Sequence, residues 1–318
     1  MKPQNRSRHA RPHAKSQGFA HKRPSAPARE DASPKNHHGK KLGPQTQKRN
    51  RHSGESRNDA RTIRPQQKPV REGVLLWGLH AVREAWLNPK RKCFKLWVTA
   101  AGREALAGVL AAATLDNLVR PAPQVMERVE LDRLLPPNSV HQGVALDVAA
   151  LPEKSLHEIL DAEPLPDLLV VLDQVTDPHN VGAILRSAAA LGAGAIIMTE
   201  RNAPGTTGVL AKAASGAVEH VPIIHVVNLA RALNELREAG YWCVGLAEEA
   251  AQNLSDLDLS ARTALVLGAE GEGLRRLTRE SCDELARLPT GGAIGSLNVS
   301  NAAAVALYEA RRQKWKFG

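Results

Sequence analysis

Apolar residues follow two spacings along most of this chain, beginning near Gly73. Short continuous apolar runs predict buried strands, and apolar residues three or four positions apart predict amphipathic helices. Between residues 73 and 151 an apolar run at 74–78 leads into a predicted helix at 79–87, and the pattern then predicts strands at 94–99 and 144–148 and helices at 104–113 and 125–135. Together these elements predict a small α/β domain over residues 73–151.

Strand and helix patterns then alternate from Leu168 to the end of the chain. Apolar runs predict strands at 169–172, 195–198, 221–225, 242–246, 264–267 and 285–288, and the last helix is predicted at 299–314. Such alternation is typical of an α/β domain with a mostly parallel sheet covered on both faces. We therefore expect a second domain at 168–318, joined to the first by a proline-containing linker at 152–167.

The first 72 residues carry the whole of the chain's net basic excess and few apolar residues. They contain 19 Lys and Arg against five Asp and Glu, whereas the whole chain has a net charge of +10. A segment that buries so little apolar surface cannot offset its ordering entropy, so we expect 1–72 to be a disordered basic tail. Two interpretations stay open. The tail binds a polyanion, with nucleic acid favoured over membrane because no amphipathic stretch accompanies the charge, or it is a solvated tail.

The sequence contains neither the apolar core of a signal peptide nor a run of about eighteen apolar residues. We therefore expect a cytoplasmic protein with no membrane partner. Cys93, Cys243 and Cys282 lie far apart and have no Cys or His partner at ligand spacing, so we expect neither structural zinc nor a disulfide framework. Cys282 is interpreted as a core residue within a helix.

Three polar loops of the second domain each follow a predicted strand. The first runs from Asp173 to Arg186 and opens a helix, with Asn180 predicted as its N-cap and Arg186 two turns further on. Taken alone, Asn180 is best interpreted as a cap and Arg186 as a surface or salt-bridging residue. The alternative is that Arg186 holds a phosphate, because loops at the carboxyl ends of parallel strands commonly bind ligands.

Small residues dominate the other two loops. In residues 268–273 the glycines follow the spacing G-x-x-G-x-G, not the G-x-G-x-x-G of a dinucleotide site, which argues against a nucleotide-dependent dehydrogenase. A simple glycine-rich turn and a loop that approaches a ligand closely both stay open for this segment. The third loop, residues 289–300, is longer than a turn requires; Ser296 or Asn298 would cap the last helix, and the exposed amides would line a pocket.

Taken together in this order and spacing, the three loops resemble the three motifs of the SpoU/TrmH family of S-adenosylmethionine-dependent RNA ribose 2′-O-methyltransferases, within the SPOUT superfamily. The matching positions are Asn180, Gly182 and Arg186 in the first motif, Gly268, Glu270, Gly271 and Gly273 in the second, and Pro289, Ser296, Leu297, Asn298 and Ser300 in the third. Residues 73–151 resemble the small L30e-like substrate-binding domain that many members carry. The chain is most similar to members that methylate guanosine in bacterial 23S rRNA.

The resemblance implies a knotted catalytic domain and a cofactor. Members fold the carboxyl end of this domain into a trefoil knot, which periodicity alone would not predict. S-adenosylmethionine is expected in the knot, and no metal is expected. The residues expected to contact the cofactor are Gly268, Gly271, Gly273, Leu288 and Leu297.

The resemblance also implies catalytic residues, an RNA substrate and a second subunit. Arg186 is expected to activate or orient the ribose 2′-hydroxyl, while Asn180 and Glu270 shape the RNA side of the pocket and Ser296 and Asn298 hold the target and loop. The predicted activity is 2′-O-methylation of a ribose, expected to be guanosine in 23S rRNA, by a homodimer. The alternatives are a tRNA ribose 2′-O-methyltransferase or a non-catalytic RNA-binding factor for ribosome assembly.

Overall fold

The structure is a computed structural model that describes residues 73–201, 203–293 and 295–315. The predicted basic tail at 1–72 lies outside the described residues. None of the helices in the described ranges is both long and apolar enough to span a membrane.

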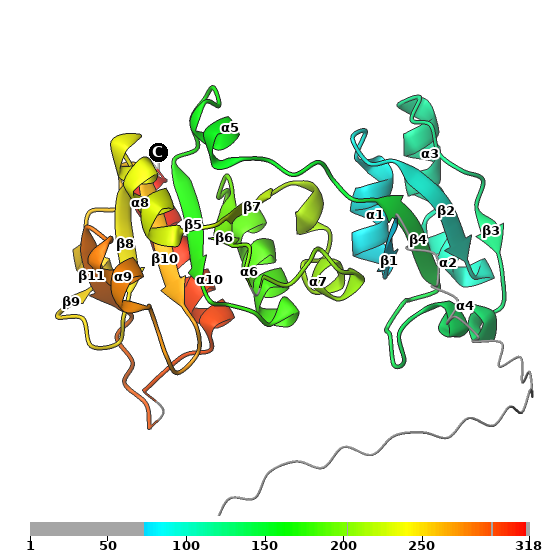
Figure 1. Cartoon of the computed structure of the whole chain (residues 1–318). Helices are drawn as coiled ribbons and strands as arrows, with labels where there is room; N and C mark the ends of the chain where they lie inside the picture. The colour runs from blue at the N-terminus through cyan, green and yellow to red at the C-terminus, as the bar shows by residue number, and fades with distance from the viewer. Residues whose placement is uncertain (1–72, 202, 294, 316–318) are drawn as a thin grey trace, which may run out of the picture. The chain divides into compact units, whose positions relative to one another are not determined.

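Residues 73–149 form a four-stranded sheet with helices on both faces (Figure 1). The strand order is β1-β4-β2-β3, in which β2 and β3 are parallel and the other neighbours antiparallel. Leu96 and Val98 pack with α1 and α3, whereas Trp77 and Ala145 pack with α4. The elements are β1 (Gly73–Trp77), α1 (Leu79–Leu87), β2 (Cys93–Val98), α2 (Ala100–Ala105), α3 (Ala107–Leu115), β3 (Gln124–Val125), α4 (Arg128–Leu134) and β4 (Val144–Ala149).

Two predictions for this region are wrong in detail. The helix predicted at 104–113 is observed as two helices, α2 and α3, divided at Leu106. α2 starts earlier than predicted because Thr99 caps it by accepting a hydrogen bond from the Gly102 backbone N–H. The helix predicted at 125–135 begins only at Arg128. Val125, the first residue of the predicted helix, instead belongs to β3 and lies opposite Val98 of β2. Both errors concern short elements whose ends are set by pairing or capping.

The second region contains a seven-stranded sheet of order β7-β6-β5-β10-β8-β11-β9, in which every pairing is parallel. Its strands are β5 (Leu168–Asp173), β6 (Ile196–Thr199), β7 (Ile223–Val226), β8 (Trp242–Leu246), β9 (Gln252–Asn253), β10 (Thr263–Gly268) and β11 (Glu284–Arg287). Its helices are α5 (Leu156–Leu160), α6 (Pro178–Ala190), α7 (Gly208–Ala213), α8 (Leu229–Glu238), α9 (Arg276–Glu280) and α10 (Val299–Lys314). The last helix has the predicted bounds.

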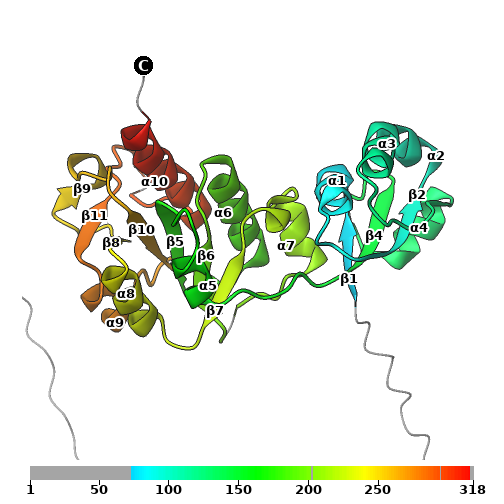
Figure 2. The ribbon, with the colours of Figure 1, turned by 90° about the horizontal axis from the view of Figure 1, so that it is seen from above.

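Helices cover both faces of this sheet, as the pattern predicts (Figure 2). The β5 side chains alternate: Val170 and Leu172 pack with α6 and α10, whereas Leu169 and Val171 pack with α8. A strand buried on both faces needs apolar residues at every position, which explains the continuous apolar run. The predicted α/β fold with a mostly parallel sheet is confirmed.

Residues 152–167, predicted as a linker, contain the short helix α5. Ser155 and Glu158 form a capping box, and Leu156 and Ile159 are buried against the sheet. Prolines on both sides of this helix obscure it in the sequence. The domain boundaries themselves stay predictions.

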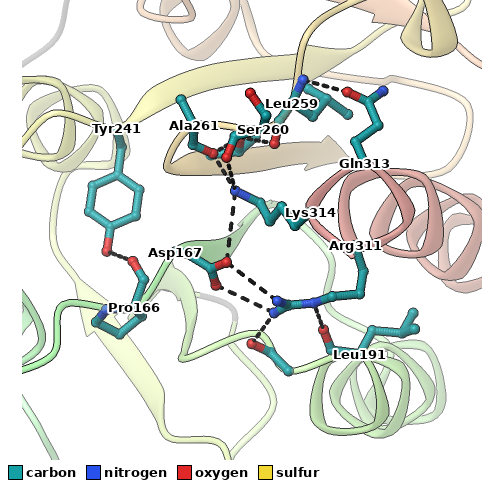
Figure 3. A network of polar contacts seen from close by, with 12 residues as sticks. Pro166, Asp167, Leu191, Tyr241, Leu259, Ser260, Ala261, Arg311, Gln313 and Lys314 are labelled. Atoms are coloured by element: carbon teal, nitrogen blue, oxygen red, sulfur yellow. Dashed lines mark hydrogen bonds and ion pairs between the residues drawn. The ribbon is translucent and has the colours of Figure 1, made fainter. Parts of the chain in front are cut away.

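Polar contacts of partly buried side chains fasten the carboxyl end of α10 to the rest of this region (Figure 3). Arg311 donates from Nε to the Leu191 carbonyl at 2.7 Å and from Nη2 to the Gly192 carbonyl at 2.8 Å. Its guanidinium also pairs with Asp167 at 3.3 Å. Lys314 donates to the carbonyls of Ser260 and Ala261. The carboxyl end of α10 is therefore held to the segments that precede β5 and β10.

We expect Arg311→Ala to lower the free energy of unfolding by about 2 kcal/mol, because two carbonyls lose charge-assisted hydrogen bonds. Urea denaturation would measure the loss. Arg312→Ala is the matched control, since Arg312 pairs with Glu309 on its own helix and should leave the midpoint near that of the wild type. Equal losses in the two variants would contradict this account of the anchor.

Candidate active site

The three polar loops meet at one edge of the parallel sheet. β5 and β10 are neighbours in register, so that Asp173 lies opposite Gly268 where both strands end. The first loop leaves β5, the second leaves β10, and the third leads from β11 into α10. Because the carboxyl ends of parallel strands share an edge, loops that are about a hundred residues apart in the sequence become neighbours.

Hydrogen bonds join one residue from each loop into a cluster of Asn180, Glu270 and Asn298. Asn298 Nδ2 donates to Asn180 Oδ1 at 3.0 Å and to Glu270 Oε1 at 2.5 Å. Asn180 Nδ2 donates to the same Glu270 oxygen at 3.0 Å. The structure therefore brings together three of the five predicted catalytic residues.

Helix capping fixes the orientation of the Asn298 amide. Its Oδ1 accepts hydrogen bonds from Ser300 N at 2.9 Å and Ser300 Oγ at 2.6 Å, as the N-cap of α10. The Nδ2 group must then point toward Asn180 and Glu270. The prediction of Asn298 as a cap is confirmed, and the same side chain links the helix to the cluster.

Asn180 is not the N-cap of α6, and that prediction is wrong. Asp177 is the cap: its carboxylate accepts a hydrogen bond from the His179 backbone N–H, and Pro178 occupies the first helical position. Proline suits that position because the first N–H of a helix has no internal partner. Asn180 is thus inside the first turn, where its side chain is available to Glu270.

A cleft of about 570 Å³ opens beside the cluster. Its lining includes most of the predicted contact residues, namely Gly268, Glu270, Gly271, Gly273, Leu288, Ser296, Leu297 and Asn298. The volume lies within the range of pockets that hold small organic ligands. Small residues form much of the wall, as the composition of the second and third loops predicts.

Arg186 stands apart from the cluster and the cleft. It is exposed on α6, does not line the cleft, and forms no hydrogen bond or ion pair within the described residues. Asn180 does not line the cleft either, but its bonds to Glu270 and Asn298 connect it to the wall. Gly182 has a packing role, because a Cβ there would lie 2.5 Å from that of Ala213 on α7.

The glycines of the second loop allow the loop to fold back on its own strand. A Cβ at Gly268 would lie 2.1 Å from the backbone carbonyl carbon of Gly273, which no side chain can tolerate. Gly273 also has a positive φ of 67° and donates its N–H to the Ala269 carbonyl at 2.9 Å. The close contact at Gly268 is therefore with the loop itself, as a glycine-rich turn predicts, and approach to a ligand stays a prediction.

Sequence reasoning missed the wall contributed by the end of β8. Leu246, Ala247, Glu248 and Glu249 line the cleft, as does Arg279. Glu249 forms an ion pair with Arg279, and a hydrogen bond from its own backbone N–H together with that guanidinium lowers the pKa of the Glu249 carboxyl. The local signal was two consecutive glutamates shortly after a predicted strand, but only the sheet order places that strand beside β10.

The cysteines take no part in the candidate site. Burial raises the pKa of the Cys243 and Cys282 thiols to about 12, so both remain protonated at neutral pH. Cys282 follows α9 rather than lying within a helix as predicted, because α9 ends at Glu280. Among the described residues no three His, Cys, Asp or Glu side chains are grouped so as to hold a metal ion.

Comparisons with known proteins match this arrangement to one family. Residues 167–308 match the model of the SpoU rRNA Methylase family, and residues 75–154 match a model described as RNA 2′-O ribose methyltransferase substrate binding. The 23S rRNA (guanosine-2′-O-)-methyltransferase RlmB of Pseudomonas putida is 42% identical over 242 residues, which cover 75% of this chain and 96% of that protein. The protein of the same name from Ralstonia nicotianae is 45% identical and covers 76% and 96%.

Solved structures support the same family assignment. The SpoU methyltransferase AviRb of Streptomyces viridochromogenes, in complex with the cofactor AdoMet, has a TM-score of 0.62 and 28% identity, and covers 76% of this chain and 91% of that one. An AdoMet-bound rRNA methyltransferase of Sinorhizobium meliloti has a TM-score of 0.61 and 26% identity, with 77% and 89% covered. The resemblance inferred from the three motifs is therefore confirmed.

We expect Asn298→Ala to lower the free energy of unfolding by about 1 kcal/mol more than Asn228→Ala does, because Glu270 also loses a charge-assisted hydrogen bond. Asn228 is a matched control, since it is the asparagine N-cap of α8 and lies away from the cleft. Chemical denaturation of both variants would measure the difference. If the two losses were the same, the cluster would contribute no stability beyond the helix cap.

Proposed function

Because the chain belongs to the SpoU rRNA methylase family, we propose that it transfers a methyl group from S-adenosylmethionine to the 2′-hydroxyl of a ribose in RNA. The observation that carries the proposal is the Asn180, Glu270 and Asn298 cluster beside the cleft, which unites the three motifs. The aligned region covers 96% of each of two relatives, and both are named as 23S rRNA (guanosine-2′-O-)-methyltransferases.

The cleft suits S-adenosylmethionine in size and lining. Its volume of about 570 Å³ and its lining of small and polar residues fit a nucleoside-sized ligand with many hydrogen-bonding groups. Gly268, Leu288 and Leu297 would hold the adenosine, with Gly271 and Gly273 shaping the wall. When bound, the cofactor supplies a methyl group on a positively charged sulfur, and the C–S electron pair returns to that sulfur without the help of a metal.

Arg186 orients the ribose hydroxyl in this proposal. The hydroxyl oxygen bonds to the methyl carbon and its proton leaves to water. An arginine stays protonated near neutral pH, so its main contribution is to position the hydroxyl and a neighbouring phosphate through several fixed donors. The exposed, unpaired state of Arg186 among the described residues supports a role toward RNA. Glu270, Asn180, Ser296 and Asn298 then shape the side of the pocket that receives the target.

The proposed target is a guanosine in 23S rRNA, and we propose that the small domain at residues 73–151 helps to recognise this RNA. Two observations support it: the names of relatives that align along almost their whole length, and the match of residues 75–154 to a substrate-binding model. The proposed location is the cytoplasm, where bacterial ribosomal RNA is found. Transfer of labelled methyl to 23S rRNA but not to tRNA, followed by nuclease digestion to 2′-O-methylguanosine, would test the assignment.

We expect Arg186→Lys to lower the rate of methyl transfer about 10²-fold at saturating cofactor, because the lysine keeps the charge but loses the planar fork that positions the hydroxyl. Cofactor affinity should stay unchanged, since Arg186 does not line the cleft. The matched control is Arg276→Lys on α9, which pairs with Glu280 outside the cleft. A wild-type rate in Arg186→Lys would show that the assignment is wrong.

The proposed assembly is a homodimer that buries α10. Val305, Tyr308 and Trp315 are 48%, 52% and 44% exposed on or directly after this helix, and the rings of Tyr308 and Trp315 pack edge to face at 6.0 Å. Large apolar side chains gathered on one element are typical of subunit interfaces.

We expect Tyr308→Glu to convert the dimer into monomers, because a charged side chain would be buried without a partner. Light scattering after size-exclusion chromatography would measure the mass. Leu277→Glu, on the exposed side of α9, is the control and should leave the mass unchanged. A dimer that persists in Tyr308→Glu would place the interface elsewhere.

A further inference from the structure

A buried carboxylate that the proposed chemistry does not use lies at the end of β5. Asp173 is 0% exposed and lies at the start of the first polar loop. Both of its oxygens are occupied by one residue: Arg275 N donates to Oδ2 at 2.9 Å, and Arg275 Nε donates to Oδ1 at 2.7 Å. A buried carboxylate is costly unless such bonds are made, so the position of Arg275 is tightly determined.

Arg275 ends the loop that begins at Gly268. The upstream end of the loop continues directly from β10, where Gly268 pairs in register with Asp173. The loop then folds back, with the Gly273 N–H bonded to the Ala269 carbonyl at 2.9 Å. Both ends of the loop are therefore fixed at one point of the sheet, the first by the strand and the second by the Asp173 carboxylate.

This loop forms one wall of the cleft and carries Glu270. Every residue from Gly268 to Leu274 lines the cleft, and Leu274 is 4% exposed beneath it. The Glu270 carboxylate accepts the hydrogen bonds of Asn180 and Asn298 only while the loop keeps its folded-back shape. Release of the downstream end would displace both the wall and the carboxylate.

We propose that Asp173 is a positioning residue that acts through Arg275: its carboxylate holds the loop of residues 268–275 in the shape that binds the cofactor and presents Glu270. The inference rests on the proposed function, because it takes the cleft as the cofactor site. Asp173 itself does not line the cleft.

The chain offers a matched control for this contact. Asp283 also accepts a backbone hydrogen bond, from Cys243 N at 2.8 Å, and forms an ion pair with an arginine, Arg237, at 2.7 Å. None of these three residues lines the cleft. Asp283→Asn therefore makes the same chemical change at a similar contact on another part of the sheet.

The test compares Asp173→Asn with Asp283→Asn in the full chain, at a temperature where circular dichroism shows both to be folded. An asparagine keeps the shape but loses the charge, and its amide group opposes an Arg275 donor. Asp173→Asn should raise the dissociation constant and the KM for S-adenosylmethionine about tenfold, because the weakened contact with Arg275 holds the loop less firmly in its binding shape. The KM for RNA should change less, and Asp283→Asn should change neither constant.

Variants of Arg275 provide a second test of the proposal in case Asp173→Asn fails to fold. Arg275→Ala keeps the backbone donor but removes Nε, so cofactor affinity should fall. Arg275→Lys restores a cation and should recover part of the lost affinity. A general loss of stability would not produce this recovery. Wild-type cofactor affinity in folded Asp173→Asn or in Arg275→Ala, or an equal loss in Asp283→Asn, would overturn the proposal.

A third variant separates this inference from the assignment of the cleft. Ser296→Trp places a large side chain in the cleft from an exposed loop position. Loss of cofactor binding in Ser296→Trp with normal binding in Asp173→Asn would refute only the role of Asp173. Normal binding in Ser296→Trp would refute the assignment of the cleft itself.

Discussion

The parallel pairing of β5 with β10 is the constraint on which the site depends. Six residue pairs, from Leu168 opposite Thr263 to Asp173 opposite Gly268, set where both strands end. A shift of one residue would turn the apolar side chains of one strand toward the wrong helices and would separate the loops that follow. With this register, Asn180 on α6 and Glu270 after β10 come within hydrogen-bonding distance, and Asn298 joins them at the start of α10.

Much of the fold could be predicted because the sheet is buried on both faces. β5 reads as an uninterrupted apolar run, and α10 begins at a cap and ends in a basic turn, so its predicted bounds agree with the structure. β9 could not be predicted, because Gln252 and Asn253 have no apolar pattern and form a strand by pairing with β11. The cap of α6 was wrongly assigned because Asn180 resembles a cap, although Asp177 and Pro178 carry the stronger signal.

The candidate site could be predicted in part. Spacing alone left Arg186 and Asn180 as ordinary surface and capping residues, and only the resemblance of all three loops gave them roles. The structure places Asn180, Glu270 and Asn298 in contact and lines the cleft with the second and third loops, yet the residue-level roles stay proposals. Glu248 and Glu249 were missed because their importance depends on β8 lying beside β10, which is a property of sheet order and not of local sequence.

The most direct test of the proposed function is mass spectrometry of ribosomal and transfer RNA from a strain that lacks this gene. The account predicts that one 2′-O-methylguanosine is missing from 23S rRNA, and that the gene for the wild-type chain restores it whereas the gene for Arg186→Lys does not. An unchanged set of ribose methylations in 23S rRNA, or a methyl group missing only from tRNA, would contradict it.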